Sequence, residues 1–286
     1  MDMTRRYQRD RKSRKSRKKT VGIVAACIIV VAVVLVISLS GRGSVVAFPD
    51  PNLETAIREA LNRPSGPINA SELAELSNLT ASDSGIEDLS GLQYCTNLID
   101  LDLWHNQVTD ISPLGNLTNL TYLELGDNGI SDISPLGNLT NLRYLYLYSN
   151  QIGDISPLVN LNDLRSLSLQ YNQVNDVSPL ANLTSLRELD LWHNQISDIS
   201  PLANLTNLTY LYLPRNQISD ISPLANLTNL TEILLYSNQI SDISPLVENP
   251  GLGTDDYVTL GDNPLSSDSI KIYLPELRAR GVAIDS

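Results

Sequence analysis

Hydrophobic and polar residues recur along most of the chain in one fixed pattern. Residues 120–141 read LTYLELGDNGISDISPLGNLTN, and residues 142–163 read LRYLYLYSNQIGDISPLVNLND. The cycle L-x-x-L-x-L-x-x-N-x-I-x-D-I-S-P-L-x-N-L-x-x runs with small variations from Leu98 to about Asn249, and its central Asn returns every 22 residues. A period of roughly 20–29 residues with L-x-x-L-x-L-x-x-N is the signature of a leucine-rich-repeat solenoid.

The L-x-L segment of each cycle predicts a short β-strand, because residues two apart point to the same side of a strand. Leu101 and Leu103 are expected to face the core, while Asp100, Asp102 and Trp104 face solvent. One strand per cycle builds a parallel sheet with strands ~4.8 Å apart. The predicted fold is therefore α/β: a right-handed, horseshoe-shaped leucine-rich-repeat solenoid with a parallel β-sheet on its concave face and short 3-10 or helical turns on its convex face.

Polar residues also hold fixed places in the cycle. The Asn, as at Asn106, lies between apolar positions, so its amide is expected to be buried and to bond backbone groups of its own and the neighbouring turn. The Asp, as at Asp110, is expected to bond the backbone of the turn that follows; a ladder of calcium sites is the alternative. In the S-P-L that comes next, Ser is expected to cap a short turn and Pro to occupy its first position.

The first forty residues predict a membrane anchor. Residues 1–20 hold ten Lys and Arg and form a basic cytoplasmic tail, and residues 21–40 contain nineteen consecutive uncharged residues. That length suits a transmembrane helix across a hydrocarbon core of ~30 Å, with the basic side inside. Two alternatives are a signal peptide cleaved near Val45–Ala47 and a lipoprotein modified at Cys27.

Predicted caps close the two ends of the solenoid. After a linker at 41–47, a helical N-terminal cap spans 48–75, the repeats span 76–250, and a C-terminal cap spans 251–286. In the first cap, Asp50 can serve as N-cap of a helix whose apolar stripe is Leu53, Ile57, Ala60 and Leu61, and a second helical stretch is expected at 71–76.

The C-terminal cap is expected to begin with a strand at 257–261. A helix follows at 267–280 with Ile270, Tyr273, Leu274 and Leu277 on one apolar face. A short edge strand is expected at 282–284.

These motifs resemble the internalin-type leucine-rich-repeat proteins of bacterial surfaces. The resemblance rests on the 22-residue repeat with N-x-I-x-D-I-S-P-L and on the helical F-x-D-x-x-L-x-x-A-I-R segment that begins at Phe48. It covers roughly residues 48–250 and implies a bacterial surface protein that binds other molecules. Internalins typically carry further C-terminal domains or a wall-sorting signal; here we expect neither, and an N-terminal anchor instead.

Charge and cysteine content narrow the function. The net charge of −12 combines a strongly basic first 20 residues with a body of about −20. Such a body repels nucleic acid, whose phosphates recruit Lys and Arg, so no nucleic-acid binding is expected. Cys27 lies in the apolar segment and Cys95 in a repeat, so no disulfide between them is expected.

The outward strand positions are the ones that the repeat leaves free to vary. They hold eight of the twelve Tyr, both Trp and both His. Aromatic side chains with a polar group are preferred anchors of binding surfaces, and cross-strand stacking that stiffens the sheet is the alternative. The predicted ligand-binding residues are Asp102, Trp104, His105, Tyr122, Glu124, Tyr144, Tyr146, Tyr148, Tyr171, Asp190, Trp192, His193, Tyr210, Tyr212, Arg215 and Tyr236.

A second regularity relates turns that lie 88 residues apart. The segment DLWHNQ occurs at 102–107 and again at 190–195, and LYSNQI occurs at 147–152 and 235–240. Two related patches would then lie about 19 Å apart along the sheet. They favour an elongated or repetitive partner, although gene duplication explains the pattern equally well.

Catalysis is not expected. His105, Asp127 and Ser149 occupy one column, but Asp stands in the middle where a nucleophilic triad needs His. A flat solvated sheet offers no enclosed pocket, and no zinc, phosphate or dinucleotide motif is present. The sequence thus predicts a monomeric, non-enzymatic binding module without cofactor or metal, anchored in the cell membrane with its repeats outside the cytoplasm. Its predicted partner is a protein, and the acidic body favours a basic one. The alternatives are binding of a carbohydrate or cell-wall glycan and a purely structural spacer.

Overall fold

The computed structural model describes residues 43–286, so the predicted tail and transmembrane segment lie outside the described residues. Within 43–286, no helix combines the length and apolar character needed to cross a membrane. The chain divides into two compact units. The first joins the described residues up to Val46 with Pro67–Ser71, and the second comprises Ala47–Gly66 and Glu72–Ser286.

The small unit consists of two short antiparallel strands, β1 (Val45–Val46) and β2 (Ile68–Asn69). The Ala70 amide donates a hydrogen bond to the Ser44 carbonyl at 2.9 Å and extends this pairing. The sequence did not predict this pair, because two-residue strands leave no hydrophobic period to detect.

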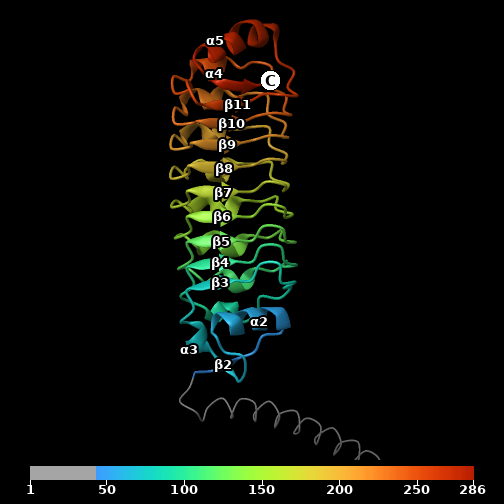
Figure 1. The fold of residues 1–286 in the computed structure, drawn as a ribbon, viewed down its shortest axis with the longest axis vertical. Coiled ribbons are helices and arrows are strands. Elements are labelled where there is room, and N and C mark those ends of the chain that lie inside the picture. The colour runs from blue at the N-terminus through green and yellow to red at the C-terminus, as the bar shows by residue number, and fades with distance from the viewer. Residues whose placement is uncertain (1–42) are drawn as a thin grey trace, which may run out of the picture. The chain divides into compact units, whose positions relative to one another are not determined.

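The large unit is a leucine-rich-repeat solenoid with one parallel sheet of ten strands in sequence order (Figure 1). The solenoid prediction is confirmed. The strands are β3 (Asn78–Thr80), β4 (Asp100–Asp102), β5 (Tyr122–Glu124), β6 (Tyr144–Tyr146), β7 (Ser166–Ser168), β8 (Glu188–Asp190), β9 (Tyr210–Tyr212), β10 (Glu232–Leu234), β11 (Tyr257–Thr259) and β12 (Ala283–Asp285).

The core is a stack of aliphatic layers, one layer per turn. The central residue of each strand pairs with its equivalent in the next turn, as Leu101 does with Leu123. Leu101, Leu103 and the apolar residues at equivalent positions of β5 to β11 are fully buried. Each turn therefore has a core only because its neighbours cover it, which is why the repeat must keep its apolar positions constant.

The Asn column forms the predicted hydrogen-bonded ladder. Asn106 is 8% exposed, and its Nδ2 donates to the carbonyls of Ala81 at 2.8 Å and Leu103 at 2.9 Å. Its Oδ1 accepts from the Ile86 amide at 2.9 Å. The side chain thus satisfies backbone groups of two adjacent turns, and the same contacts recur at the six Asn that follow in this column.

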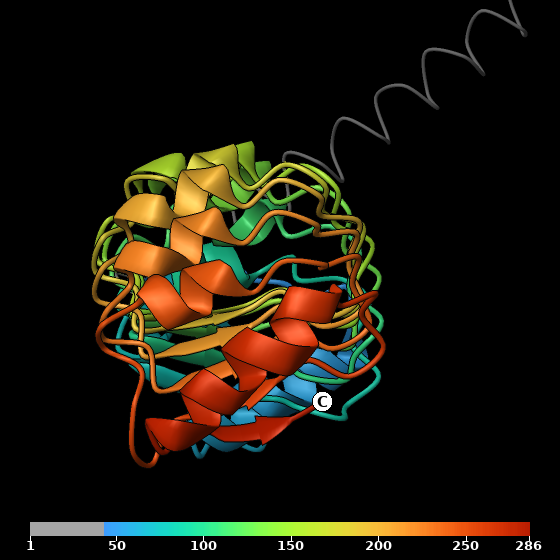
Figure 2. The ribbon, with the colours of Figure 1, turned by 90° about the horizontal axis from the view of Figure 1, so that it is seen from above.

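The helical turns lie on the side of the coil opposite the sheet (Figure 2). The Asp column caps them. The Asp110 carboxylate accepts from the Ser112 amide at 2.8 Å, and the six later Asp of the column repeat this bond. The prediction that Ser caps these turns is wrong: Ser is the first turn residue and Pro the second, because the preceding carboxylate takes the capping role.

Most of these turns are 3-10 helices. They span Leu92–Tyr94, Ser112–Leu114, Ser134–Asn138, Ser156–Asn160, Ser178–Leu180, Ser200–Asn204 and Ser222–Asn226, and α4 (Ser244–Glu248) takes their place in the last repeat.

The helix α2 (Pro51–Ala60) packs beside β3 at the start of the solenoid. Asp50 caps it as predicted, and its second carboxylate oxygen accepts from the amides of Glu87 at 2.7 Å and Asp88 at 3.1 Å. One side chain therefore caps the helix and fastens it to the first repeat. The buried stripe includes Ala56, while Ala60 is exposed, so the predicted place of Ala60 is wrong. The second helix, α3 (Ala70–Leu73), is shorter than predicted.

The C-terminal cap keeps the repeat pattern before closing it. Asn263 accepts from the Ile240 amide at 3.0 Å, as Asn of earlier turns do. A π-helical turn (Ser269–Tyr273) leads into α5 (Leu274–Ala279), which packs against α4. The wider π turn carries Ile270 outward, where it is 53% exposed, so its predicted place on the buried face is wrong. The edge strand β12 is confirmed, one residue later than expected.

Candidate ligand-binding face

The predicted binding residues all lie on the exposed face of the large sheet. We call this surface the sheet face. Parallel pairing aligns equivalent positions of successive turns, so the residues form four columns. The first contains Tyr122, Tyr144 and Tyr210; the second Asp102, Glu124, Tyr146, Asp190 and Tyr212; the third Trp104, Tyr148, Trp192 and Tyr236; and the fourth His105, Tyr171, His193 and Arg215.

The fourth column has left-handed backbone geometry that the sequence analysis missed. His105, Tyr171, His193 and Arg215 have φ angles of 53°, 54°, 55° and 53°. Residues other than Gly seldom adopt this region. The conformation lets each amide continue the ladder, as the His105 amide does by donating to the Gly126 carbonyl at 3.0 Å. Its only sequence signal is the constant place immediately before the Asn of each repeat.

Exposure differs among the predicted residues. Trp104, Tyr144, Tyr171 and Tyr210 are 42%, 38%, 41% and 41% exposed. Glu124, predicted to face solvent, is only 8% exposed, and it lies close enough to Tyr122 and Tyr148 to raise the pKa of both phenols. The largest accessible groups on the sheet face are therefore aromatic.

The aromatic rings form two clusters. In the first, the Tyr122 ring lies 6.5 Å from that of Tyr144 and 5.6 Å from that of Tyr146. In the second, the Tyr171 ring lies 4.9 Å from Trp192 and 5.0 Å from the ring of the adjacent His193. Cross-strand contacts between aromatic rings, which the sequence left as an alternative, are thus present as tilted pairs, and Tyr144 and Tyr171 remain exposed.

Gly126 is a residue of this face whose role the sequence did not reveal. A side chain at Gly126 would collide with the Tyr148 ring, since a Cβ built there lies 2.4 Å from its Cζ atom. The absence of a side chain therefore lets the ring lie over Gly126. Its column has one other Gly, Gly261, where a built Cβ would meet no atom within 4 Å.

Two carboxylates on the sheet face have raised pKa values. Burial raises the pKa of Glu124 to about 7, with a further contribution from the negative charge of Asp102. Burial likewise raises the pKa of Asp190 to about 6, helped by Glu188. Each accepts one backbone hydrogen bond, which partly offsets the cost of burying charge. Negative charge is thus held on this face at an energetic cost.

The tyrosines near these carboxylates are neutral phenols at physiological pH. Burial and the adjacent carboxylates raise the pKa of Tyr122, Tyr148 and Tyr212 to about 12. Their hydroxyl groups can therefore both donate and accept hydrogen bonds.

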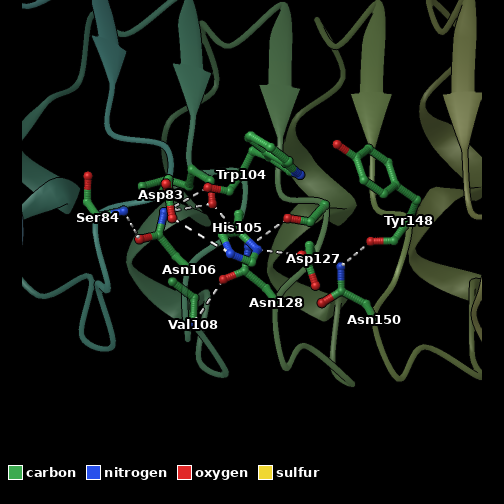
Figure 3. Close-up of polar contacts among 12 residues, drawn as sticks. Asp83, Ser84, Trp104, His105, Asn106, Val108, Asp127, Asn128, Tyr148 and Asn150 are labelled. Carbon is green, nitrogen blue, oxygen red and sulfur yellow. Dashed lines mark hydrogen bonds and ion pairs between the residues drawn. The ribbon is translucent and has the colours of Figure 1, made fainter.

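His105 lies between two carboxylates of the adjacent turns (Figure 3). Its Nδ1 is 2.5 Å from Asp127 Oδ2, and its Nε2 is 3.7 Å from Asp83 Oδ1. These three side chains are half exposed or more, so they contribute to the charge of the surface.

Two polar groups of the face are buried and, within the described chain, have no hydrogen-bond partner. They are the Ser168 hydroxyl on β7 and the Trp192 indole N–H. Buried polar groups are normally paired. The middle of the sheet face therefore holds two polar groups whose hydrogen-bonding capacity is unused.

This arrangement can stack, donate and accept hydrogen bonds and attract cations. Between residues 43 and 286, no hydrogen bond joins either His to a Ser hydroxyl. Over the same residues, no three His, Cys, Asp or Glu side chains gather as metal ligands. Cys95 is buried in the core, and burial raises the pKa of its thiol to about 12.

Comparison with known families and structures agrees with the repeat fold. The model of leucine-rich repeats (2 copies) matches residues 118–160, 162–204 and 206–248. No curated protein matches the chain. Among solved structures, internalin C2 from Listeria monocytogenes is 44% identical, covers 71% of this chain and 91% of its own, and has a TM-score of 0.69.

Two other solved structures extend the comparison. The internalin InlF from Listeria monocytogenes is 35% identical over 84% of this chain and 91% of its own, with a TM-score of 0.42. The leucine-rich-repeat ectodomain of the plant membrane receptor kinase GASSHO1/SCHENGEN3 from Arabidopsis thaliana, in complex with CASPARIAN STRIP INTEGRITY FACTOR 2, is 26% identical, with a TM-score of 0.64. It is similar over 76% of this chain and 27% of its own.

Proposed function

This chain belongs to the internalin family of leucine-rich-repeat proteins, and from that premise we propose that it recognises a protein partner through the sheet face. Internalin leucine-rich-repeat proteins are non-enzymatic, which confirms the expectation that this chain is not an enzyme. The observation that carries the proposal is the exposure of Trp104, Tyr144, Tyr171 and Tyr210 on one surface. Exposed aromatic rings on a rigid sheet contribute large contact areas with little loss of conformational entropy.

The negative charge of the sheet face favours a partner with a basic surface. Complementary charge raises the association rate and suppresses unsuitable partners. The plant receptor ectodomain, similar over most of this chain, is described in complex with another factor, which supports a binding role for this repeat fold.

The test is capture of surface-exposed proteins by the full chain and by variants. Combined Trp104→Ala and Tyr210→Ala substitutions are expected to abolish capture of a protein that the wild type retains. Val159→Ala is the matched control, because Val159 is 42% exposed and lies in a 3-10 turn outside the sheet. Capture that survives the double substitution would contradict binding through the sheet face.

A salt series distinguishes a protein from the carbohydrate alternative. Binding to a basic protein weakens as ionic strength screens the charges, whereas stacking of Trp and Tyr on sugar rings depends little on salt. Capture that is unchanged between ~0.1 and ~1 M salt, and that a soluble glycan competes, would favour the carbohydrate.

We further propose that residues 21–40 anchor the repeats at the cell membrane, outside the cytoplasm. The proposal rests on nineteen uncharged residues preceded by a block of Lys and Arg. The intact mass of the protein in membrane and medium fractions tests it: the full mass is expected in the membrane. A soluble form that starts near Phe48 would instead indicate a cleaved signal peptide.

A further inference from the structure

A shallow groove lies at the N-terminal end of the sheet face. Its volume is about 400 Å³, and it extends from β3 to the first residue of β6. The lining residues are Asn78, Leu79, Thr80, Asp100, Leu101, Asp102, Thr121, Tyr122 and Tyr144. Its polar lining includes two carboxylates and two phenols, and none of the lining residues carries a positive charge.

The two carboxylates of the groove are held by neutral donors alone. Asp100 Oδ2 accepts from Asn78 Nδ2 at 2.6 Å, and Asp102 Oδ1 accepts from the Trp104 amide at 3.0 Å. In the described part of the chain, no Lys, Arg or His forms an ion pair with either carboxylate. The hydrogen bonds orient the carboxylates, and their charges are left uncompensated.

A third acidic side chain lies beside the groove. Glu124 pairs in register with Asp102 on the adjacent strand and is 8% exposed. Its Oε1 accepts from the Gly126 amide at 2.7 Å, again a neutral donor. Three acidic groups therefore lie on two adjacent strands, where a cation would relieve their mutual repulsion.

The aromatic wall gives the groove a second property that suits a cation. The rings of Tyr122 and Tyr144 lie 6.5 Å apart at an interplanar angle of 41°. Burial and nearby acidic groups raise the pKa of Tyr122 to about 12, so its ring is a neutral π surface. Cations bind over such rings within about 6 Å of the centroid.

We propose that this groove binds an arginine side chain of the partner protein. The inference rests on the proposed function and identifies the group that the sheet face recognises at this end. A guanidinium group fits better than an ammonium group, because it can bond carboxylates with its planar fork and stack on a Tyr ring at the same time.

The test uses the full chain and two short peptides, acetyl-Gly-Gly-Arg-Gly-Gly-amide and the same peptide with citrulline, the uncharged isostere of arginine. Ligand-observed NMR titration measures the affinity of each. The arginine peptide is expected to bind, and the citrulline peptide at least about threefold more weakly. Asp102→Asn is expected to weaken binding of the arginine peptide by a similar factor.

A control for this variant lies outside the predicted binding residues. Asp163 is an exposed Asp in the turn before β7, and it does not line the groove. Asp163→Asn is therefore expected to leave the affinity unchanged. Asp100→Asn is a second groove variant, and it keeps the test decisive if Asp102→Asn fails to fold.

Three outcomes would overturn the proposal: equal binding of the two peptides, equal losses in Asp102→Asn and Asp163→Asn, or tighter binding of the corresponding lysine peptide. These failures are distinct from failure of the proposed function. The peptide titration needs no partner protein, and the capture experiment uses substitutions at Trp104 and Tyr210, which do not line the groove.

Discussion

The turns at 102–107 and 190–195 share the sequence DLWHNQ and the same backbone. In both, the Asp carboxylate accepts a hydrogen bond from the Trp amide at 3.0 Å. In both, the His residue has a left-handed conformation, with φ of 53° or 55°. The Asn of each turn donates to carbonyls of its own and the preceding turn. Identical residues therefore produce identical local structure.

The side chains that surround the two turns differ in charge. His105 lies between Asp83 and Asp127 of the adjacent turns. Its counterpart four turns on has Tyr171 on one side, at 5.0 Å between ring centroids, and Arg215 on the other. The first turn is thus set among acids, and the second between an aromatic ring and a base.

The two Trp residues differ as well. Trp104 is 42% exposed. Trp192 is half-buried, with its ring 4.9 Å from that of Tyr171 and 6.5 Å from that of Tyr236. The repeat therefore determines the backbone of each turn. The residues 22 positions before and after it, on the adjacent turns, determine the charge around its side chains and their exposure. The two turns are therefore not two copies of one binding site.

The largest expected effect on stability comes from the Asn side chain that both turns share. Asn106→Ala and Asn194→Ala are each expected to lower the free energy of unfolding by about 2–3 kcal/mol, because each leaves buried backbone groups of two turns without partners. Urea unfolding of the full chain, followed by circular dichroism, measures the loss. Gln107→Ala and Gln195→Ala, at the exposed adjacent positions, should change it little. A loss at only one of the two Asn would show that the turns are not equivalent in structure.

The next largest effect on stability is expected to differ between the two turns, because their Trp residues differ in exposure. Trp192→Ala is expected to cost about 2 kcal/mol of unfolding free energy, because it removes ring contacts within the second aromatic cluster. Trp104→Ala is expected to cost less than about 1 kcal/mol, since that side chain is more exposed. The same urea titration compares them. Equal losses would mean that the difference in exposure has no energetic consequence.

These differences mark how far the sequence alone could predict the molecule. The strands, the Asn ladder and the Asp capping bonds follow from the 22-residue period, because each is repeated and depends on local or adjacent contacts. The burial of Glu124 and the Tyr148 ring over Gly126 do not follow, because each depends on which large side chain the next turn carries. The exposed Ile270 was missed for a related reason: a π turn changes the helical period from which its face was inferred.

The buried carboxylate lies at a different position near each of the two turns, and the pH dependence of stability tests this difference. Burial raises the pKa of Asp190 to about 6, above the ordinary value of 3.8. The folded state therefore binds a proton more readily than the unfolded state, so this residue destabilises the fold above about pH 6 and ceases to do so as the pH falls towards about 4. Asp190→Asn is expected to raise the free energy of unfolding by roughly 1 kcal/mol at pH 7, after allowance for solvent screening.

The control is the same measurement at pH 4, where Asp190→Asn should bring no gain. In the first turn, the buried carboxylate is instead Glu124 on the neighbouring strand, whose pKa is raised by burial to about 7. Glu124→Gln should therefore gain stability at pH 8, and this gain should fade between about pH 7 and 4.5. Gains that are independent of pH would mean that the substitutions act through packing.

The smallest effect concerns the neighbours of the two His residues. Asp127→Asn is expected to cost about 0.5 kcal/mol at low salt, since the pair with His105 is half exposed, and the loss should vanish in ~1 M NaCl. Arg215 is the equivalent residue beside the second His and has no ion pair in the described part of the chain. Arg215→Gln should therefore change stability by less than the error of a urea titration at either salt concentration. If the two substitutions respond alike to salt, the acidic surroundings of the first turn do not hold its His in place.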